Sequence, residues 1–271
     1  MKHTIGFIGC GKMGQAILSG MIGRKGMDPS KILVSARTES TLEDLKTRFE
    51  IQGTTNNQEV AKRSDILFLA IKPNLYGEII ESIKDIVRES VIIVTVAAGI
   101  DTEYVREAFG REVKVVRTMP NTPSMVGEGM TPYCINRFIT EEDQSVIENL
   151  LQSIGKCERI SENLMDAIPA ISGSSPAYVY MMIEAMADGG VKQGIPRDQA
   201  YKLAAQAILG AAKMVVETGR HPGALKDDVC TPGGATIEAV ASLEKTGFRS
   251  SILMAMDECT NKIKFLSETM K

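Results

Sequence analysis

The sequence predicts an α/β fold: an N-terminal, doubly wound parallel sheet of the Rossmann type, followed by a C-terminal all-helical domain. Short, almost continuously apolar runs alternate with helical patterns in the first half of the chain, as expected for parallel strands covered by helices on both faces. A glycine-rich turn joins the first apolar run to the first helical pattern. After about residue 160 the strand-like runs stop.

The predicted elements of the first part follow one another with short connections. We expect strands at 4–9, 31–36, 65–71, 91–97, 114–119 and 129–136, and helices at 16–26, 41–50, 75–87, 102–110 and 141–154. Crossovers between parallel strands are expected to be right-handed. We place this dinucleotide-binding domain at residues 1–162.

The second predicted domain, residues 163–271, contains helices at 177–194, 195–219, 235–247 and 249–270. The helix at 195–219 opens with Pro196 and closes with Gly219, which are favoured at these positions. Its apolar face is broad, and the domain has few aromatic residues for a core of its own. That face either packs within the chain or packs against a second subunit.

The overall composition excludes several classes of protein. The formal net charge is −3, without a lysine–arginine block, so we expect no nucleic-acid partner. No run approaches the roughly 18 apolar residues of a membrane helix, and the N-terminus leads directly into a strand without a signal sequence. Five scattered cysteines and only two histidines predict reduced thiols, a cytoplasmic location and no metal site.

The stretch GCGKMG places Gly9, Gly11 and Gly14 in a GxGxxG pattern between a predicted strand and a predicted helix. In this context Gly9 permits the tight turn, Gly11 lets the backbone approach a pyrophosphate, and Gly14 lets the helix pack closely on the strand. The positive end of the helix dipole then faces the anion. The pattern predicts a dinucleotide site.

The end of the second predicted strand bears on which dinucleotide is bound. NAD-preferring sites place a carboxylate there, whereas this sequence reads Ser35-Ala36-Arg37-Thr38, with the first carboxylate at Glu39. Hydroxyl donors and an arginine suit a 2′-phosphate. We therefore expect NADPH as the preferred cofactor, with NADH possible.

Two later strand ends and one rigid turn are further candidates for the cofactor crevice, which lies at carboxyl strand ends. Small residues at Ala97 and Ala98 allow a close approach of the nicotinamide half, and Lys72 either lies near it or is an ordinary surface lysine. Asn121, between two prolines in PNTP, either points at a ligand or belongs to a purely structural turn.

The late stretch TPGGAT opens a predicted helix and raises the question of the hydride acceptor. Neither histidine is well placed to move an alcohol proton, so reduction of a C=N bond, which demands less acid catalysis, is favoured. Hydroxyls at Ser174, Ser175, Thr231 and Thr236 could contact the imine nitrogen. Gly233 and Gly234 could form a backbone nest for a carboxylate; a plain turn is the alternative.

Seven segments in this order carry a resemblance to a known family: GFIGCGKMGQAI, LFLAIKP, VAAGI, RTMPNTP, SGSSPAYVY, HPGALKDDVCTPGGATIEAV and GFRSSILMAMDECT. Together they resemble pyrroline-5-carboxylate reductase, over essentially the whole chain. The resemblance implies NAD(P)H-dependent reduction of 1-pyrroline-5-carboxylate to L-proline, the last step of proline synthesis. It also implies a dimer formed through the helical domain, and in many members a ring of dimers.

The resemblance assigns roles to individual residues. The cofactor contacts fall on Gly9, Cys10, Gly11, Lys12, Met13, Gly14, Ser35, Arg37, Asn57, Ala70, Ile71, Lys72, Pro73, Val96, Ala97 and Ala98. We add Asn121 to this set of predicted cofactor contacts. The substrate set is Ser174, Thr231, Gly233, Gly234, Ala235 and Thr236. In it, backbone N–H groups around Gly234 to Thr236 hold the substrate carboxylate. The Thr236 hydroxyl faces the ring nitrogen and is the expected catalytic group.

Two alternative functions remain open. A β-hydroxyacid dehydrogenase shares the two-domain plan, but that family would call for a lysine that is absent from Ser172 to Met186. A dinucleotide-sensing protein that has lost catalysis is the non-enzyme alternative, against which the intact TPGGAT segment argues.

Overall fold

The computed structural model describes residues 3–23 and 26–270 of the 271-residue chain. Its contacts divide the chain into two compact units. The first unit comprises Met1–Ser174 together with Cys259–Lys271, and the second comprises Ser175–Glu258. The predicted domain boundary after residue 162 stays a prediction.

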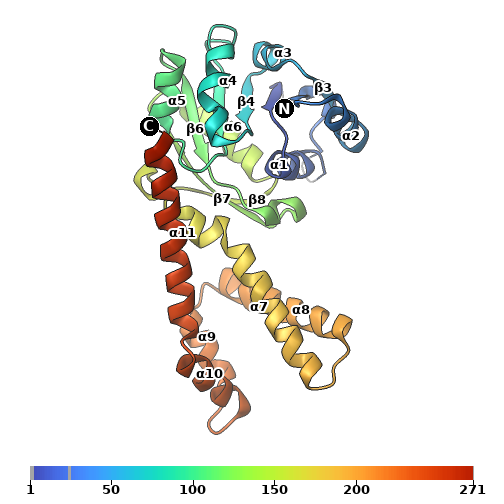
Figure 1. Ribbon diagram of the computed structural model, residues 1–271, viewed down its shortest axis with the longest axis vertical. Helices are drawn as coiled ribbons and strands as arrows, with labels where there is room; N and C mark the ends of the chain where they lie inside the picture. The colour runs from blue at the N-terminus through green and yellow to red at the C-terminus, as the bar shows by residue number, and fades with distance from the viewer. Residues whose placement is uncertain (1–2, 24–25, 271) are drawn as a thin grey trace. The chain divides into compact units, whose positions relative to one another are not determined.

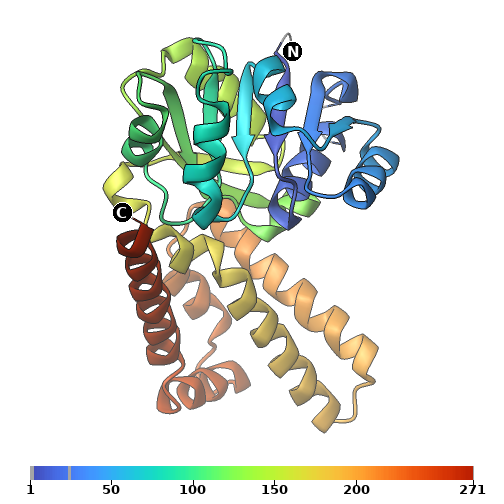
Figure 2. The same cartoon turned by 45° about the horizontal axis from the view of Figure 1, so that its top comes forward.

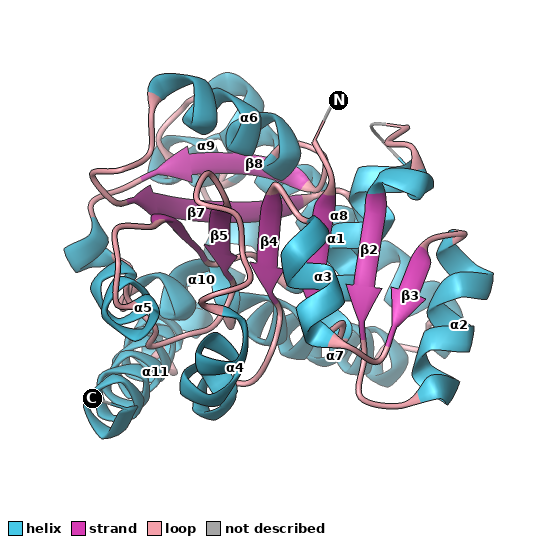
Figure 3. Ribbon diagram, turned by 90° about the horizontal axis from the view of Figure 1, so that it is seen from above, coloured by secondary structure: helices cyan, strands magenta, loops and turns pink. Residues whose placement is uncertain are grey.

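Within the described residues, the first unit contains a sheet of eight strands in the order β3-β2-β1-β4-β5-β6-β7-β8 (Figures 1 and 3). The pairs from β3 through β6 are parallel, β7 runs antiparallel to β6, and β8 is parallel to β7. The strands are β1 (Ile5–Ile8), β2 (Ile32–Ser35), β3 (Gln52–Thr54), β4 (Ile66–Leu69), β5 (Ile92–Thr95), β6 (Lys114–Thr118), β7 (Gly129–Ile135) and β8 (Gly155–Arg159).

Helices cover both faces of this sheet, because successive strand side chains point to opposite sides. Ile66 and Phe68 of β4 pack in the core beneath α1 (Lys12–Gly23), α2 (Glu39–Phe49) and α6 (Glu141–Leu151). Leu67 and Leu69 pack in the core beneath α3 (Asn57–Arg63), α4 (Tyr76–Ile83) and α5 (Thr102–Phe109). The doubly wound fold class is confirmed.

All six predicted strands are present, but the sheet is not purely parallel. Only residues 119–128, which include the short turn η3 (Thr122–Val126), connect β6 to β7. A parallel return needs a crossover of a dozen or more residues, so β7 pairs antiparallel with β6. The sequence patterns also missed β3, β8 and α3. β3 and β8 have only half-buried and exposed residues, so they carry no apolar run.

The second unit is helical, with α7 (Ser175–Lys192), α8 (Arg197–Thr218), α9 (Pro222–Val229), α10 (Ala235–Lys245) and the first part of α11 (Phe248–Met270). The helices α7 and α8 form a helical hairpin (Figure 2). The four predicted helices are confirmed, and the short α9 was not predicted. No helix in the described ranges is long and apolar enough to cross a membrane.

Candidate functional site

Gly9 lies where β1 ends, at the point where the strand order reverses between β1 and β4. Its φ of 77° is in the left-handed region, and a β-carbon there would lie 2.8 Å from the Ala70 carbonyl oxygen. The Gly9 N–H donates to the Ser35 carbonyl at 3.0 Å. Both the backbone angle and the close approach of β4 therefore require glycine, as the sequence predicted.

Gly11 and Gly14 differ in their surroundings in the way the glycine pattern predicts. A β-carbon on Gly11 would meet no atom within 4 Å, whereas one on Gly14 would lie 3.2 Å from Cys10 Sγ and 3.4 Å from Ala70 Cβ. Gly11 thus leaves open space beside the N-terminus of α1, whose first turn has no acidic residue. This open space and the free N–H groups of a helix start fit a pyrophosphate.

Cys10 is the second residue of this turn, and it is buried. Burial raises the pKa of the Cys10 thiol to about 12. The thiol therefore stays neutral at physiological pH and adds no negative charge beside a phosphate.

The predicted 2′-phosphate residues gather at the carboxyl ends of β2 and β3, but their roles differ. The Ser35 side chain is fully buried, and its hydroxyl donates to Asn57 Oδ1 at 2.6 Å. It thus orients Asn57 and is not presented to a ligand in this arrangement. Arg37 is exposed, and Thr38 caps α2 by accepting from the Thr41 N–H.

The ends of β4 and β5 supply small, partly exposed surfaces. Ala70, Val96 and Ala98 are half-buried, and Lys72 is exposed. Behind them the buried Tyr76 hydroxyl donates to the Leu69 carbonyl at 2.6 Å. Burial raises the pKa of Tyr76. The sequence patterns did not single out this tyrosine, which supports the end of β4.

Asn121 is buried, and both ends of its side chain are used inside the fold. Its Nδ2 donates to the Ser172 carbonyl at 2.9 Å, and its Oδ1 accepts from the Met130 N–H at 3.0 Å. The sequence left open whether Asn121 points at a ligand or belongs to a purely structural turn. These contacts support the structural role. A direct contact of Asn121 with the cofactor stays a prediction.

The TPGG stretch forms a turn that leads into α10. The Gly234 N–H donates to the Thr231 carbonyl at 3.0 Å, and Gly233 has a φ of 68°, which is the geometry of a type II turn with Pro232 in its second position. A β-carbon on Gly234 would collide with the Thr231 hydroxyl. The Gly234 N–H thus closes the turn and is not available to the carboxylate nest that the sequence suggested for Gly233 and Gly234.

The N-terminus of α10 instead provides the donors. Gly234 is its N-cap, with no side-chain capping hydrogen bond, so the first N–H groups from Ala235 onward are left for an anion. Thr236 is the second residue of the helix and is half-buried. Within the described part of the chain, its hydroxyl has no hydrogen-bond partner.

Ser174, the remaining predicted substrate residue, belongs to the first unit. Its hydroxyl lies 3.4 Å from Cys259 Sγ. The predicted residues are thus brought together in two groups: the cofactor set and Ser174 in the first unit, and residues 231–236 in the second.

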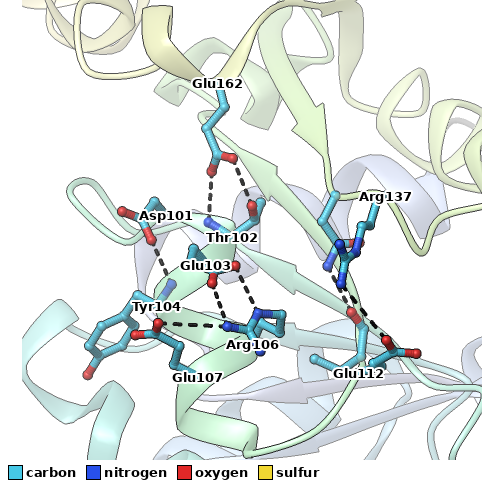
Figure 4. A network of polar contacts seen from close by, with 11 residues as sticks. Asp101, Thr102, Glu103, Tyr104, Arg106, Glu107, Glu112, Arg137 and Glu162 are labelled. Atoms are coloured by element: carbon cyan, nitrogen blue, oxygen red, sulfur yellow. Dashed lines mark hydrogen bonds and ion pairs between the residues drawn. The ribbon is translucent and has the colours of Figure 1, made fainter.

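A surface hollow of about 440 Å³ lies elsewhere, between α5 and the turn after β7. Figure 4 shows its two arginines engaged with carboxylates, Arg106 with Glu103 and Arg137 with Glu112. Within the described residues, no group of three or more histidine, cysteine or acidic side chains could hold a metal.

The fold and the glycine turn at its switch point define a dinucleotide-binding protein. Residues 4–99 match the family described as NADP oxidoreductase, coenzyme F420-dependent, and residues 162–266 match the family described as pyrroline-5-carboxylate reductase dimerisation. The chain belongs to the pyrroline-5-carboxylate reductase family, as its curated relatives show.

The pyrroline-5-carboxylate reductase of Escherichia coli (strain K12) is 45% identical over 269 residues, which cover 99% of this chain and 100% of that protein. The Arabidopsis thaliana enzyme is 38% identical, covering 99% and 97%. Among solved structures, the Coxiella burnetii reductase has a TM-score of 0.90 at 32% identity, covering 98% and 99%. The Plasmodium falciparum reductase with NADP bound has a TM-score of 0.89 at 31% identity, covering 98% of each chain.

Proposed function

We propose that this chain reduces 1-pyrroline-5-carboxylate to L-proline with NADPH, the final step of proline biosynthesis. Membership of the reductase family over the whole chain supports this reaction. The observation that carries it is the start of α10. There the helix N-terminus has no side-chain cap, and the neighbouring Thr236 hydroxyl has no hydrogen-bond partner among the described residues. A substrate with a carboxylate beside an imine nitrogen matches these two groups.

The first unit holds the cofactor. NADPH, when bound, supplies a hydride to the imine carbon. The turn from Gly9 to Gly14 and the start of α1 bind the pyrophosphate, and the exposed Arg37 binds the 2′-phosphate beside Asn57. NADH lacks that phosphate and is the weaker donor. The strand ends at residues 70–73 and 96–98 hold the nicotinamide half.

The second unit holds the substrate. Its carboxylate accepts from the N–H groups of Ala235 and Thr236, whose helix dipole stabilises the negative charge. The Thr236 hydroxyl hydrogen-bonds the ring nitrogen, which carries a proton in the product. Thr231, Gly233 and Gly234 form the TPGG turn that precedes these groups. Ser174, which belongs to the first unit, is a further substrate contact that we propose. Positioning, more than strong acid catalysis, accounts for the rate.

The helical unit also forms a dimer. Large apolar side chains stand exposed along α7, α8 and α11, among them Tyr180, Met181, Leu209, Val216, Leu253 and Met254. The match of residues 162–266 to a dimerisation family supports the same conclusion. A ring of dimers is the larger assembly that we propose. Free cysteines are compatible with a cytoplasmic location.

The test is the loss of 340 nm absorbance when 1-pyrroline-5-carboxylate is added to the protein with NADPH, and separately with NADH. We expect turnover with both cofactors and a higher kcat/KM with NADPH. Turnover of a β-hydroxyacid but not of the imine would replace the proposal with the dehydrogenase function. NADPH binding by calorimetry without any turnover would favour a sensor.

A further inference from the structure

The segment from Glu162 to Ser174, here called the junction segment, is held to the carboxyl side of β5 and β6. It contains the short turn η4 (Glu162–Leu164) and the π-helical turn η5 (Pro169–Gly173), and it ends at the start of α7. All of it belongs to the first unit. Its last residue, Ser174, is one of the proposed substrate contacts.

The beginning of the junction segment is fixed by charged groups. The Glu162 carboxylate accepts from the Thr102 N–H and hydroxyl, each at 2.7 Å (Figure 4). The buried Arg117 of β6 lies 2.5 Å from Asp166 and 3.9 Å from Glu162. Arg117 and Thr102 therefore fix residues 162–166.

The middle of the segment is fixed by apolar packing. Met165 is fully buried against Met119 and Cys134, with Ala98 and Ile168 packed around them. Since Ala98 follows β5 and Met119 follows β6, this small cluster seats the segment on the ends of these two strands. The end of β5 is one of those that we assign to the nicotinamide half.

The end of the segment is tied by Asn121. Its Nδ2 donates to the Ser172 carbonyl at 2.9 Å, inside the π-helical turn, while its Oδ1 is held by the Met130 N–H at the start of β7. The turn closes with the Ser174 N–H donating to the Pro169 carbonyl at 2.7 Å. π-helical turns are rare and occur frequently at functional sites, and they persist only when their surroundings hold them.

We propose that Asn121 is a positioning residue, which holds the π-helical turn and with it the Ser174 hydroxyl at the ends of β5 and β6. It acts through the backbone of Ser172 and needs no contact with the cofactor. This inference rests on the proposed function, because it assumes that Ser174 contacts the imine substrate.

The substitution Asn121→Asp separates the two hydrogen bonds. The introduced carboxylate still accepts from the Met130 N–H, but it cannot donate to the Ser172 carbonyl. We expect kcat/KM for 1-pyrroline-5-carboxylate to fall by about tenfold or more, while the NADPH dissociation constant stays within about twofold. Hydrogen exchange at residues 170–176 becomes faster in the variant.

A pH profile gives a further readout. A carboxyl group buried beside a carbonyl oxygen has a raised pKa, and its protonated form can donate to Ser172. The ratio of variant to parent kcat/KM is therefore expected to rise as the pH falls from 8 to 6.

Asn136→Asp is the matched control. Asn136 makes the same pair of bonds at the other end of β6, with Nδ2 donating to the Val113 carbonyl at 2.8 Å and Oδ1 accepting from the Val115 N–H at 3.2 Å. We expect it to lower stability without changing kcat/KM or hydrogen exchange at residues 170–176.

The possible outcomes are distinct. Weaker NADPH binding in Asn121→Asp with unchanged exchange at residues 170–176 would make Asn121 a cofactor contact and overturn the inference. An equal loss of kcat/KM in both variants would reduce its role to general stability. A parent protein without turnover on the imine refutes the proposed function, whereas the exchange measurement still tests the tie to Ser172.

Discussion

At the scale of single residues, the reaction depends most directly on the Thr236 hydroxyl. It stands in the first turn of α10, beside the N–H groups that we assign to the substrate carboxylate. A hydrogen bond to a charged group is worth about 1.5–3 kcal/mol, which corresponds to a change of about 10- to 100-fold in rate.

We therefore expect Thr236→Ala to lower kcat by about 10- to 100-fold, with little change in the NADPH dissociation constant, and Thr236→Ser to retain most of the activity. The measurements are steady-state kinetics and calorimetry. Thr246→Ala is the control, because the Thr246 hydroxyl bonds the Ser242 carbonyl at 3.0 Å at the other end of α10. Parent-like kcat in Thr236→Ala would refute a role for this hydroxyl.

Some residue roles could be predicted from the sequence, because the local backbone accepts only one residue type at that position. Gly9 is an example, since its backbone angle and its distance to β4 both exclude a side chain. Other roles depend on where a partner lies in space. The bonds of Ser35 to Asn57 and of Asn121 to Ser172 join positions 22 and 51 residues apart, and no local pattern reports such pairs.

At the scale of secondary-structure elements, the start of α6 shows how one carboxylate stabilises a helix. The Asp143 side chain accepts from the Thr140 N–H and hydroxyl in a capping box, and it pairs with Lys114 at 2.7 Å. Partial burial raises the pKa of Asp143, but the hydrogen bonds from Lys114 and Thr140 outweigh it and hold the pKa below its ordinary value.

A lowered carboxyl pKa in the folded state gives stability that is complete above the unfolded pKa, about 3.9, and is lost as the pH falls through the folded value. We expect Asp143→Asn to lower the free energy of unfolding by about 1 kcal/mol at pH 7. Urea denaturation between pH 7 and pH 2.5 checks this, and the gap between parent and variant closes at the acid end. Glu142→Gln, in the same turn, is the control; a gap that does not depend on pH would contradict the assignment.

Elements with a strong apolar period were predictable, and the edge of the sheet was not. Helices cover both faces of the central parallel strands, so β1, β4 and β5 read as continuous apolar runs. The edge strands β3 and β8 have one neighbour each and tolerate polar side chains such as Gln52 and Glu158. Their placement depends on pairing with β2 and β7, which is a long-range property.

At the scale of the whole molecule, the two units bury apolar surface very unequally. The first unit has a large core on each face of its sheet. In the second, the buried apolar side chains of the described residues are Ala187, Ala200 and Ala204. Three alanines cannot stabilise a unit of this size. We therefore expect the broad apolar face of α8, whose packing the sequence left open, to be buried against another chain.

Exposed apolar side chains occur on more than one side of α8. Leu209 and Val216, seven residues apart, share one side of the helix, and Leu203 and Met214, eleven residues apart, share another. A helix that is apolar on several sides is one that other elements surround. We therefore expect α8 to be enclosed by the partner subunit in the dimer, and not to touch it along a single stripe.

The double substitution Leu209→Glu/Val216→Glu is accordingly expected to convert the assembly to single chains, because it places two charges in a desolvated interface. Sedimentation equilibrium measures the mass, and thermal unfolding is expected at a lower temperature because the unpartnered unit loses its buried surface. Thr55→Glu/Ser90→Glu adds the same charge at exposed positions of the first unit and is expected to leave the mass unchanged. If the α8 variant keeps the mass of the parent assembly, α8 lies outside the interface. If the parent protein itself sediments as a stable, folded single chain, the dimer is refuted.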